Sequence, residues 1–180
     1  MKVCARGFNV YFAAVATTMV LLCGCQTGHH HEKADKKTGA LRVHIETSPG
    51  PEGTSQTISV LRSDPVSVTI ASDPILTEAD LITAKIVESP GGFSIQVQFD
   101  ESSTLTLEQF TAAYPGRHLV IYGQWGEKLA SGRWLAAPII THRIADGRLT
   151  FTPDTSRDEA GQLVLGLNNV VKKIQKDLMK

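Results

Sequence analysis

Short stretches of alternating apolar and polar residues recur along the chain, which is the pattern of half-buried β-strands. The first runs through Leu41, Val43 and Ile45. Similar strands are expected at 58–60 and 66–70, on either side of Asp64-Pro65, at 93–99 after Pro90-Gly91-Gly92, at 118–122 and at 149–152. The stretch at 93–99, preceded by a turn, is the strongest hairpin signal.

Spacings of three and four residues predict helices elsewhere. Thr77 and Asp80 form a weak capping pattern for a short helix through Ile82, and Thr106 and Gln109 cap a second one that ends at Pro115-Gly116. A fuller capping box, Ser156 with Glu159, precedes a long stripe: Ala160, Leu163, Leu167, Val170, Val171, Ile174 and Leu178. The pattern predicts an α+β fold, with a mainly antiparallel sheet packed by two short helices and one long C-terminal amphipathic helix.

The N-terminal residues 1–24 read as a bacterial signal peptide. Lys2 and Arg6 precede an apolar stretch from Val10 to Leu22, and Leu22-Cys23-Gly24-Cys25 resembles a lipobox. The resemblance implies that Cys25 becomes the lipid-attachment residue and the membrane the anchoring partner. The alternative is an uncleaved apolar anchor. Gln26 favours the periplasmic face of the outer membrane over the inner membrane.

Residues 25–39 are polar and lack branched apolar side chains, which indicates a flexible tether. Neutral imidazoles of His29, His30 and His31 can hold a transition metal, so these residues are weak candidate ligands. The alternative is a solvated linker without a metal, and we expect no cofactor.

Composition limits the remaining possibilities. The chain has 180 residues with 18 basic and 18 acidic side chains. Its net charge of zero argues against nucleic acid as a partner. Residues 40–180, with a β-rich part at 40–75, suffice for a single domain. Cleavage before Cys25 removes the two other cysteines, so no disulfide or thiol nucleophile is expected.

Catalysis has few candidate residues. The mature chain offers His44, His118 and His142 as bases, and none lies in a recognised catalytic or nucleotide-binding motif. We therefore expect a non-enzymatic protein. Trp125 and Trp134 flank a glycine-containing stretch and form a candidate binding surface for an extended peptide or a glycan. The alternative is that both tryptophans fill the core.

A series of short motifs resembles the head of the first periplasmic region of SecD/SecF-type protein-export membrane proteins. In order, the motifs are Leu76 to Leu81, Phe99-Asp100, Thr111, Gly116-Arg117-His118-Leu119, Ala137-Pro138-Ile139, Ile144, Gly147-Arg148, Glu159-Ala160 and Leu167. The similarity spans about Leu76 to Lys172. The chain departs from the family pattern at Gly123 to Gly126, at the lengthened stretch from Glu127 to Leu135, and at Ala136.

The resemblance implies an extracytoplasmic fold that contacts a protein chain. Family members also have transmembrane helices with a proton pathway, and no second apolar run of spanning length follows Cys25, so proton-driven transport is not carried over. We expect a lipid-anchored envelope module that contacts exported or unfolded polypeptide or another envelope protein. The alternative is a structural or small-ligand-binding lipoprotein that shares only the fold.

Overall fold

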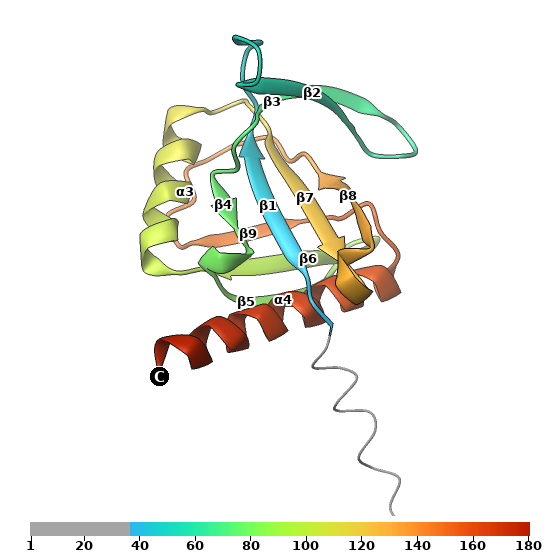
Figure 1. The fold of residues 1–180 in the computed structure, drawn as a ribbon. Helices are drawn as coiled ribbons and strands as arrows, with labels where there is room; N and C mark the ends of the chain where they lie inside the picture. Colours follow the sequence, from blue (N-terminus) through green and yellow to red (C-terminus); the bar gives the residue numbers. More distant parts are fainter. Residues whose placement is uncertain (1–36) are drawn as a thin grey trace, which may run out of the picture. The chain divides into compact units, whose positions relative to one another are not determined.

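Nine strands, two α-helices and two 3₁₀ turns form residues 37–180, the part of the chain that the computed structural model describes (Figure 1). Their order is β1 (Ala40–Ile45), β2 (Ser55–Val60), β3 (Val66–Ala71), β4 (Leu76–Thr77), η1 (Glu78–Asp80), β5 (Leu81–Ser89), β6 (Gly92–Phe99), α3 (Glu101–Ala113), β7 (Leu119–Trp125), η2 (Glu127–Leu129), β8 (Ser131–Ala136), β9 (Arg148–Phe151) and α4 (Arg157–Leu178).

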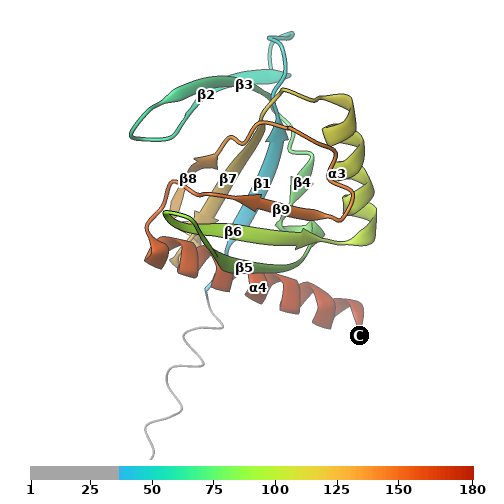
Figure 2. The same cartoon turned by 180° about the vertical axis from the view of Figure 1, so that it is seen from behind.

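Two antiparallel sheets enclose the core. One has the strand order β4-β1-β7-β8 and the other the order β5-β6-β9. The strands of one sheet run across those of the other, as both views of the ribbon show (Figures 1 and 2). Such crossed packing turns alternate residues of every strand toward a shared interior.

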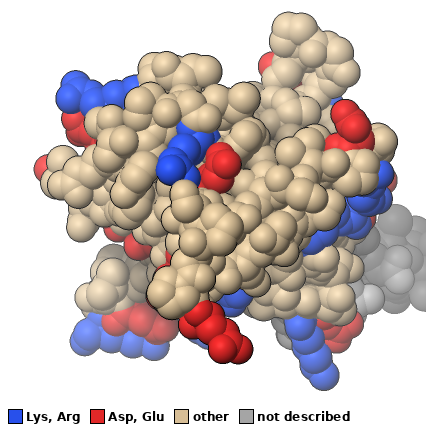
Figure 3. Space-filling model, turned by 90° about the horizontal axis from the view of Figure 1, so that it is seen from above, with Lys and Arg blue, Asp and Glu red and all other residues tan. Residues whose placement is uncertain are grey.

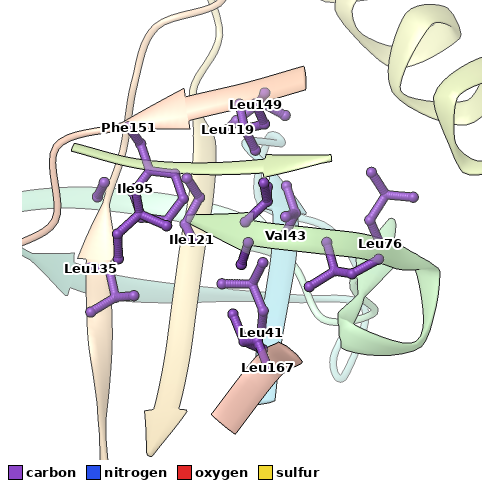
Figure 4. Packing of buried hydrophobic residues seen from close by; sticks show 14 of the residues in the cluster. Leu41, Val43, Leu76, Ile95, Leu119, Ile121, Leu135, Leu149, Phe151 and Leu167 are labelled. Carbon is purple, nitrogen blue, oxygen red and sulfur yellow. The ribbon is translucent and has the colours of Figure 1, made fainter. Parts of the chain in front are cut away.

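The interior is filled by side chains from both sheets and both α-helices. Leu41 and Ile121 of the first sheet face Ile95 and Phe151 of the second (Figure 4). Leu107 supplies the contribution of α3. Because all of these are at most 3% exposed, each adds roughly 1.5–3 kcal/mol of burial free energy relative to an exposed position.

Helix α4 covers one end of the sheets and satisfies an otherwise open strand edge. Its capping box at Ser156 and Glu159 forms as predicted. Asn168 accepts a hydrogen bond from the N–H of Ala84 and donates one to its carbonyl, both at 2.9 Å. Ala84 belongs to β5, the outer strand of its sheet, so the side-chain amide takes the place of a neighbouring strand.

The hairpin β2–β3 packs on the outer face of the first sheet. Val60, Val68 and Ile70 form a second small core with Val120 of β7. Beyond β2, Arg62 reaches across to Asp154, whose carboxylate accepts from the Arg62 amide at 2.9 Å and from the guanidinium at 3.0 to 3.2 Å. The hairpin is therefore held both by its apolar face and by an ion pair near its turn.

The α+β class is confirmed, and two helix predictions need correction. The expected helix from Thr77 to Ile82 is only the 3₁₀ turn η1, because Leu81 already pairs with Phe99 of β6. The capping box of Thr77 and Asp80 is nevertheless present. Helix α3 begins at Glu101, five residues before the expected cap at Thr106, because Asp100 caps it and accepts from the Ser103 N–H at 2.7 Å.

The stretch before β1 contacts α4. Asn169 donates a hydrogen bond to the carbonyl of Lys37 at 2.9 Å. Gly39 and Gly166 meet where the chain crosses the helix, and a Cβ at either position would lie less than 3 Å from the other segment's backbone. Two glycines thus permit a backbone contact that larger residues would prevent.

Candidate functional site

The two tryptophans proposed as a binding surface lie in different environments. Trp125 is the last residue of β7, is 2% exposed and belongs to the main hydrophobic core. The guanidinium of Arg133 lies 5.0 Å from its ring centroid and is also paired with Glu159 at 2.6 Å. The expectation that Trp125 contributes to a surface is therefore corrected. Trp134 is half-buried on β8 and remains accessible.

Trp134 forms an aromatic cluster on the outer face of the first sheet. Strand register places Arg42 opposite Tyr122 and Tyr122 opposite Trp134. The Tyr122 and Trp134 ring centroids are 5.0 Å apart, and the ring of His44 meets Trp134 edge-on at 5.4 Å. The alternation at 41–45 predicts that its polar residues share one face of a strand. Nothing in the sequence indicated that β7 and β8 would supply aromatic partners on that face.

A hollow of about 550 Å³ lies beside this cluster, between the sheet and the β2–β3 hairpin. We call it the aromatic groove, and its lining consists of Arg42, His44, Gln56, Ser72, Pro74, Tyr122, Gln124 and Trp134. A further hollow of about 570 Å³, bounded by Arg62, Arg133 and Asp154, shares Tyr122 and Trp134. The two rings are therefore reachable from two sides. Volumes of this size are typical of small-molecule sites.

His44 forms the inner wall of the aromatic groove. It is 4% exposed, and its Nδ1 lies 2.9 Å from the carbonyl oxygen of Ala71, so this nitrogen is the donor. Burial lowers the pKa of His44 more than the bond to Ala71 raises it. A neutral imidazole is therefore the stable form at neutral pH.

A separate hollow of about 600 Å³ lies between β9 and the preceding loop. We call it the β9 hollow, and its lining consists of Gln96, Leu119, residues 138–146, Arg148, Leu149 and Thr150. Strand β9 pairs with β6 on one side and with no described strand on the other. Apolar side chains form much of the wall, and Ile139 is 55% exposed at the rim.

The loop at 138–146 is fixed from both flanks. Buried Thr111 donates to the carbonyl of Leu107 within α3 at 2.7 Å and accepts from the N–H of Ile144 at 2.9 Å. Ile140 exchanges backbone hydrogen bonds with Gly116 and Arg117 at 2.9 and 2.8 Å. The β9 hollow is thus a pre-formed feature rather than a gap beside a loose segment.

The candidate catalytic histidines do not form a common site. His44 lines the aromatic groove, His142 lines the β9 hollow, and His118 pairs with Glu46 through an Nδ1 to Oε2 distance of 2.7 Å. Burial tends to raise the pKa of Glu46, but hydrogen bonds from His118 outweigh it and the net shift is downward. Within residues 37–180, no group of three His, Cys, Asp or Glu side chains is placed to hold a metal ion.

Several sequence predictions lie outside the described residues. These are the signal peptide at 1–24, lipidation of Cys25, most of the tether, and the metal-ligand candidates His29, His30 and His31. Among the helices formed by residues 37–180, none is both long enough and apolar enough to span a membrane.

Comparison with known proteins identifies the fold. No protein-family model matches the sequence, and no curated protein matches it. One solved structure, of a membrane component SecDF that enhances protein export, matches 82% of this chain and 71% of its own with a TM-score of 0.52 and 21% identity. A crystal structure of SecDF in a super-membrane-facing form matches 77% of this chain but only 20% of its own, with a TM-score of 0.52 and 20% identity. The described domain therefore has a fold similar to part of SecDF, which confirms the resemblance found in the sequence.

Proposed function

We propose that this domain is a non-enzymatic binding module that holds an extended segment of polypeptide alongside β9. The observation that carries the proposal is the outer edge of β9, which pairs with no described strand and lies next to the β9 hollow. An added strand gains affinity from main-chain hydrogen bonds, and its alternate side chains enter neighbouring pockets. The outer edge of β9 offers main-chain groups for these hydrogen bonds, and the β9 hollow offers a pocket for the side chains.

The walls of the β9 hollow suit a ligand of varied sequence. Leu119, Ile140 and Leu149 are buried behind its surface. The arginines at its rim are already paired, Arg143 with Glu108 at 3.0 Å and Arg148 with Asp146 at 3.3 Å. Because these charges neutralise one another, the hollow does not demand a charged ligand, and apolar contact with main-chain bonding would dominate binding.

The charge distribution agrees with such tolerance. On the face shown in Figure 3, most residues are uncharged, and basic and acidic side chains are interspersed. A surface of this kind lacks the single-sign field that steers nucleic acids. It supports polypeptide as the partner in preference to nucleic acid.

The cellular setting that we propose follows the sequence. Lipid attached to Cys25 would anchor the module at the periplasmic face of a membrane, with the outer membrane favoured. The fold similarity to SecDF, a component described as enhancing protein export, makes exported or unfolded chains the first partners to test. A fixed envelope protein is the other candidate for the same edge.

Site-specific crosslinking tests the proposal. A photo-reactive residue is placed at Ile139 on the rim of the β9 hollow or, as the control, at Leu105 on α3, which is equally apolar and 57% exposed. The probe is reduced, carboxymethylated α-lactalbumin, mixed with the full chain in detergent micelles. We expect crosslinks from position 139 at several times the yield from position 105. Equal yields would contradict binding at β9.

A substitution provides the second measurement. Ile139→Asp places a charge at the apolar rim and is expected to weaken binding of the same probe about tenfold, whereas Leu105→Asp is expected to leave it unchanged. Both positions are exposed, so neither variant should unfold the domain. Equal binding by both variants would remove the β9 hollow from the proposal.

A further inference from the structure

The aromatic groove gathers polar side chains that form no hydrogen bond within residues 37–180. Within the described chain, none of the following side chains forms a hydrogen bond or an ion pair: Arg42, Gln56, Ser72, Tyr122, Gln124 and Trp134. The β9 hollow differs, because both of its arginines and Gln96 are bonded to neighbours. Six unpaired polar groups converging beside aromatic rings indicate a site for a ligand with many hydrogen-bonding groups.

The backbone beneath the aromatic groove is not available for strand addition. Strand β1 is paired on both sides, with β4 and β7, and β7 is paired with β1 and β8. Over β1 and β7 the floor therefore presents side chains instead of open main-chain groups, whereas β2 and β8, which contribute Gln56 and Trp134 to the lining, are outer strands of their sheets. An extended peptide lying over β1 and β7 would find no ladder of hydrogen bonds on these strands, whereas a ligand recognised by side chains needs none.

One residue of the groove lining carries a positive charge, and Asp73, which is outside the lining, also acts electrostatically on His44. Among the described residues that line it, Arg42 carries the only formal charge, because burial keeps His44 neutral. Arg42 is exposed and forms no ion pair within residues 37–180. An unpaired guanidinium is matched in geometry by a carboxylate, which it binds through two parallel hydrogen bonds.

We propose that the aromatic groove binds a saccharide that carries a carboxylate. The apolar face of the sugar ring packs against Tyr122 and Trp134, whose rings offer contact area with little loss of rotamer freedom. Its hydroxyl groups pair with Gln56 and Gln124, and the carboxylate pairs with Arg42. The volume of about 550 Å³ is within the range of small-molecule sites.

Saturation-transfer NMR on the full chain in detergent micelles tests this proposal with matched sugars. The probes are three pairs, each differing by one acidic group: glucuronic acid and glucose, galacturonic acid and galactose, and N-acetylmuramic acid and N-acetylglucosamine. We expect at least one acid to give ring-proton signals at concentrations where its neutral counterpart gives signals about tenfold weaker. If no acid in the panel exceeds its neutral partner, the proposal is overturned.

Variants locate the site. Arg42→Gln is expected to weaken binding of the acid about tenfold while leaving the neutral sugar unchanged, and Gln124→Ala to weaken both. Both residues are at least partly exposed and unbonded through their side chains, so the fold should persist. Lys85→Gln, which removes an exposed cation from β5 of the other sheet, is the matched control and should change neither. Equal binding by the Arg42 and Lys85 variants would overturn the proposal.

The two proposed sites can be distinguished in the same preparation. If carboxymethylated α-lactalbumin displaces the acid sugar, or binds more weakly to the Arg42→Gln variant, the aromatic groove is a polypeptide site and the saccharide proposal fails. Unchanged binding of that probe alongside loss of the acid sugar would support a separate saccharide site. Failure of the β9 proposal would leave this result unaffected.

Discussion

Two glycines of α4 allow a test of how the described chain packs. Gly161 has open space where a Cβ would stand, whereas a Cβ on Gly166 would lie 2.5 Å from the Gly39 nitrogen and the Thr38 carbonyl carbon. Carbon atoms pack at about 3.5–4.0 Å. The alanine methyl at 166 therefore requires the crossing segment to move by about 1 Å, the difference between these separations.

The two substitutions have the same intrinsic effect on the helix but different packing. Replacing either glycine by alanine favours the helix by about 1 kcal/mol. For Gly161→Ala nothing opposes this gain. For Gly166→Ala, overpacking costs about 1–3 kcal/mol, and displacing the segment also weakens the hydrogen bond between Asn169 and Lys37. We expect the Gly166 variant to be less stable than the Gly161 variant by about 1–3 kcal/mol.

Urea unfolding of the full chain in detergent micelles, followed by circular dichroism, measures this difference. The Gly161 variant should have a higher midpoint than the wild type and the Gly166 variant a lower midpoint than the Gly161 variant, with similar slopes. Gly39→Ala tests the contact from the other side, because its Cβ would lie 2.8 Å from the Leu167 nitrogen. A Gly166 variant as stable as the Gly161 variant would refute the packing of residues 37–39 on α4.

Three further predictions concern single contacts. Thr111→Val should lower the unfolding free energy by about 1–3 kcal/mol, because it leaves the Ile144 N–H unsatisfied. Thr111→Ser keeps the hydroxyl group and should retain most of the wild-type unfolding free energy in the same urea assay. Burial lowers the pKa of His44. Its contribution to the free energy of unfolding is therefore complete above the unfolded-state pKa near 6.5 and declines as the pH falls below that value. We expect His44→Asn to reduce the difference in unfolding free energy measured between pH 8 and pH 5.5. The hydrogen bond from Arg62 lowers the pKa of Asp154, so the ion pair persists below the ordinary pKa of an aspartate and is lost only at more acidic pH, and NMR titration should show a higher Asp154 pKa in Arg62→Gln. An unchanged titration would contradict the ion pair.

The motif residues found in the sequence mostly have structural roles. Asp100 caps α3, Thr111 fastens the loop that follows β8, and Glu159 completes the capping box of α4. Gly147 has a φ of 67°, which favours glycine. Such residues specify a fold, and this explains why the series detected the SecDF-like architecture without indicating a ligand.

Local pattern was weakest where the chain changes from one element to the next. The residues after Thr77 have a capping box, but the strand pairing of Leu81 with Phe99 ends the turn. The sequence pattern indicates no strand between Trp125 and Trp134, yet this stretch contains the end of β7, the turn η2 and most of β8. Tertiary pairing prevailed over local propensity in both places.

The sequence alone determined the α+β class, most strand positions, the C-terminal helix and the absence of excess charge, because alternation, capping and composition are local properties. The two proposed binding surfaces depended on tertiary structure. Arg42, Tyr122 and Trp134 come together only through the register of three strands, and β9 has an edge without a neighbour among the described strands only because of its outer place in the sheet. Which neighbours a side chain meets is a property of pairing across the fold, and no single segment contains that information.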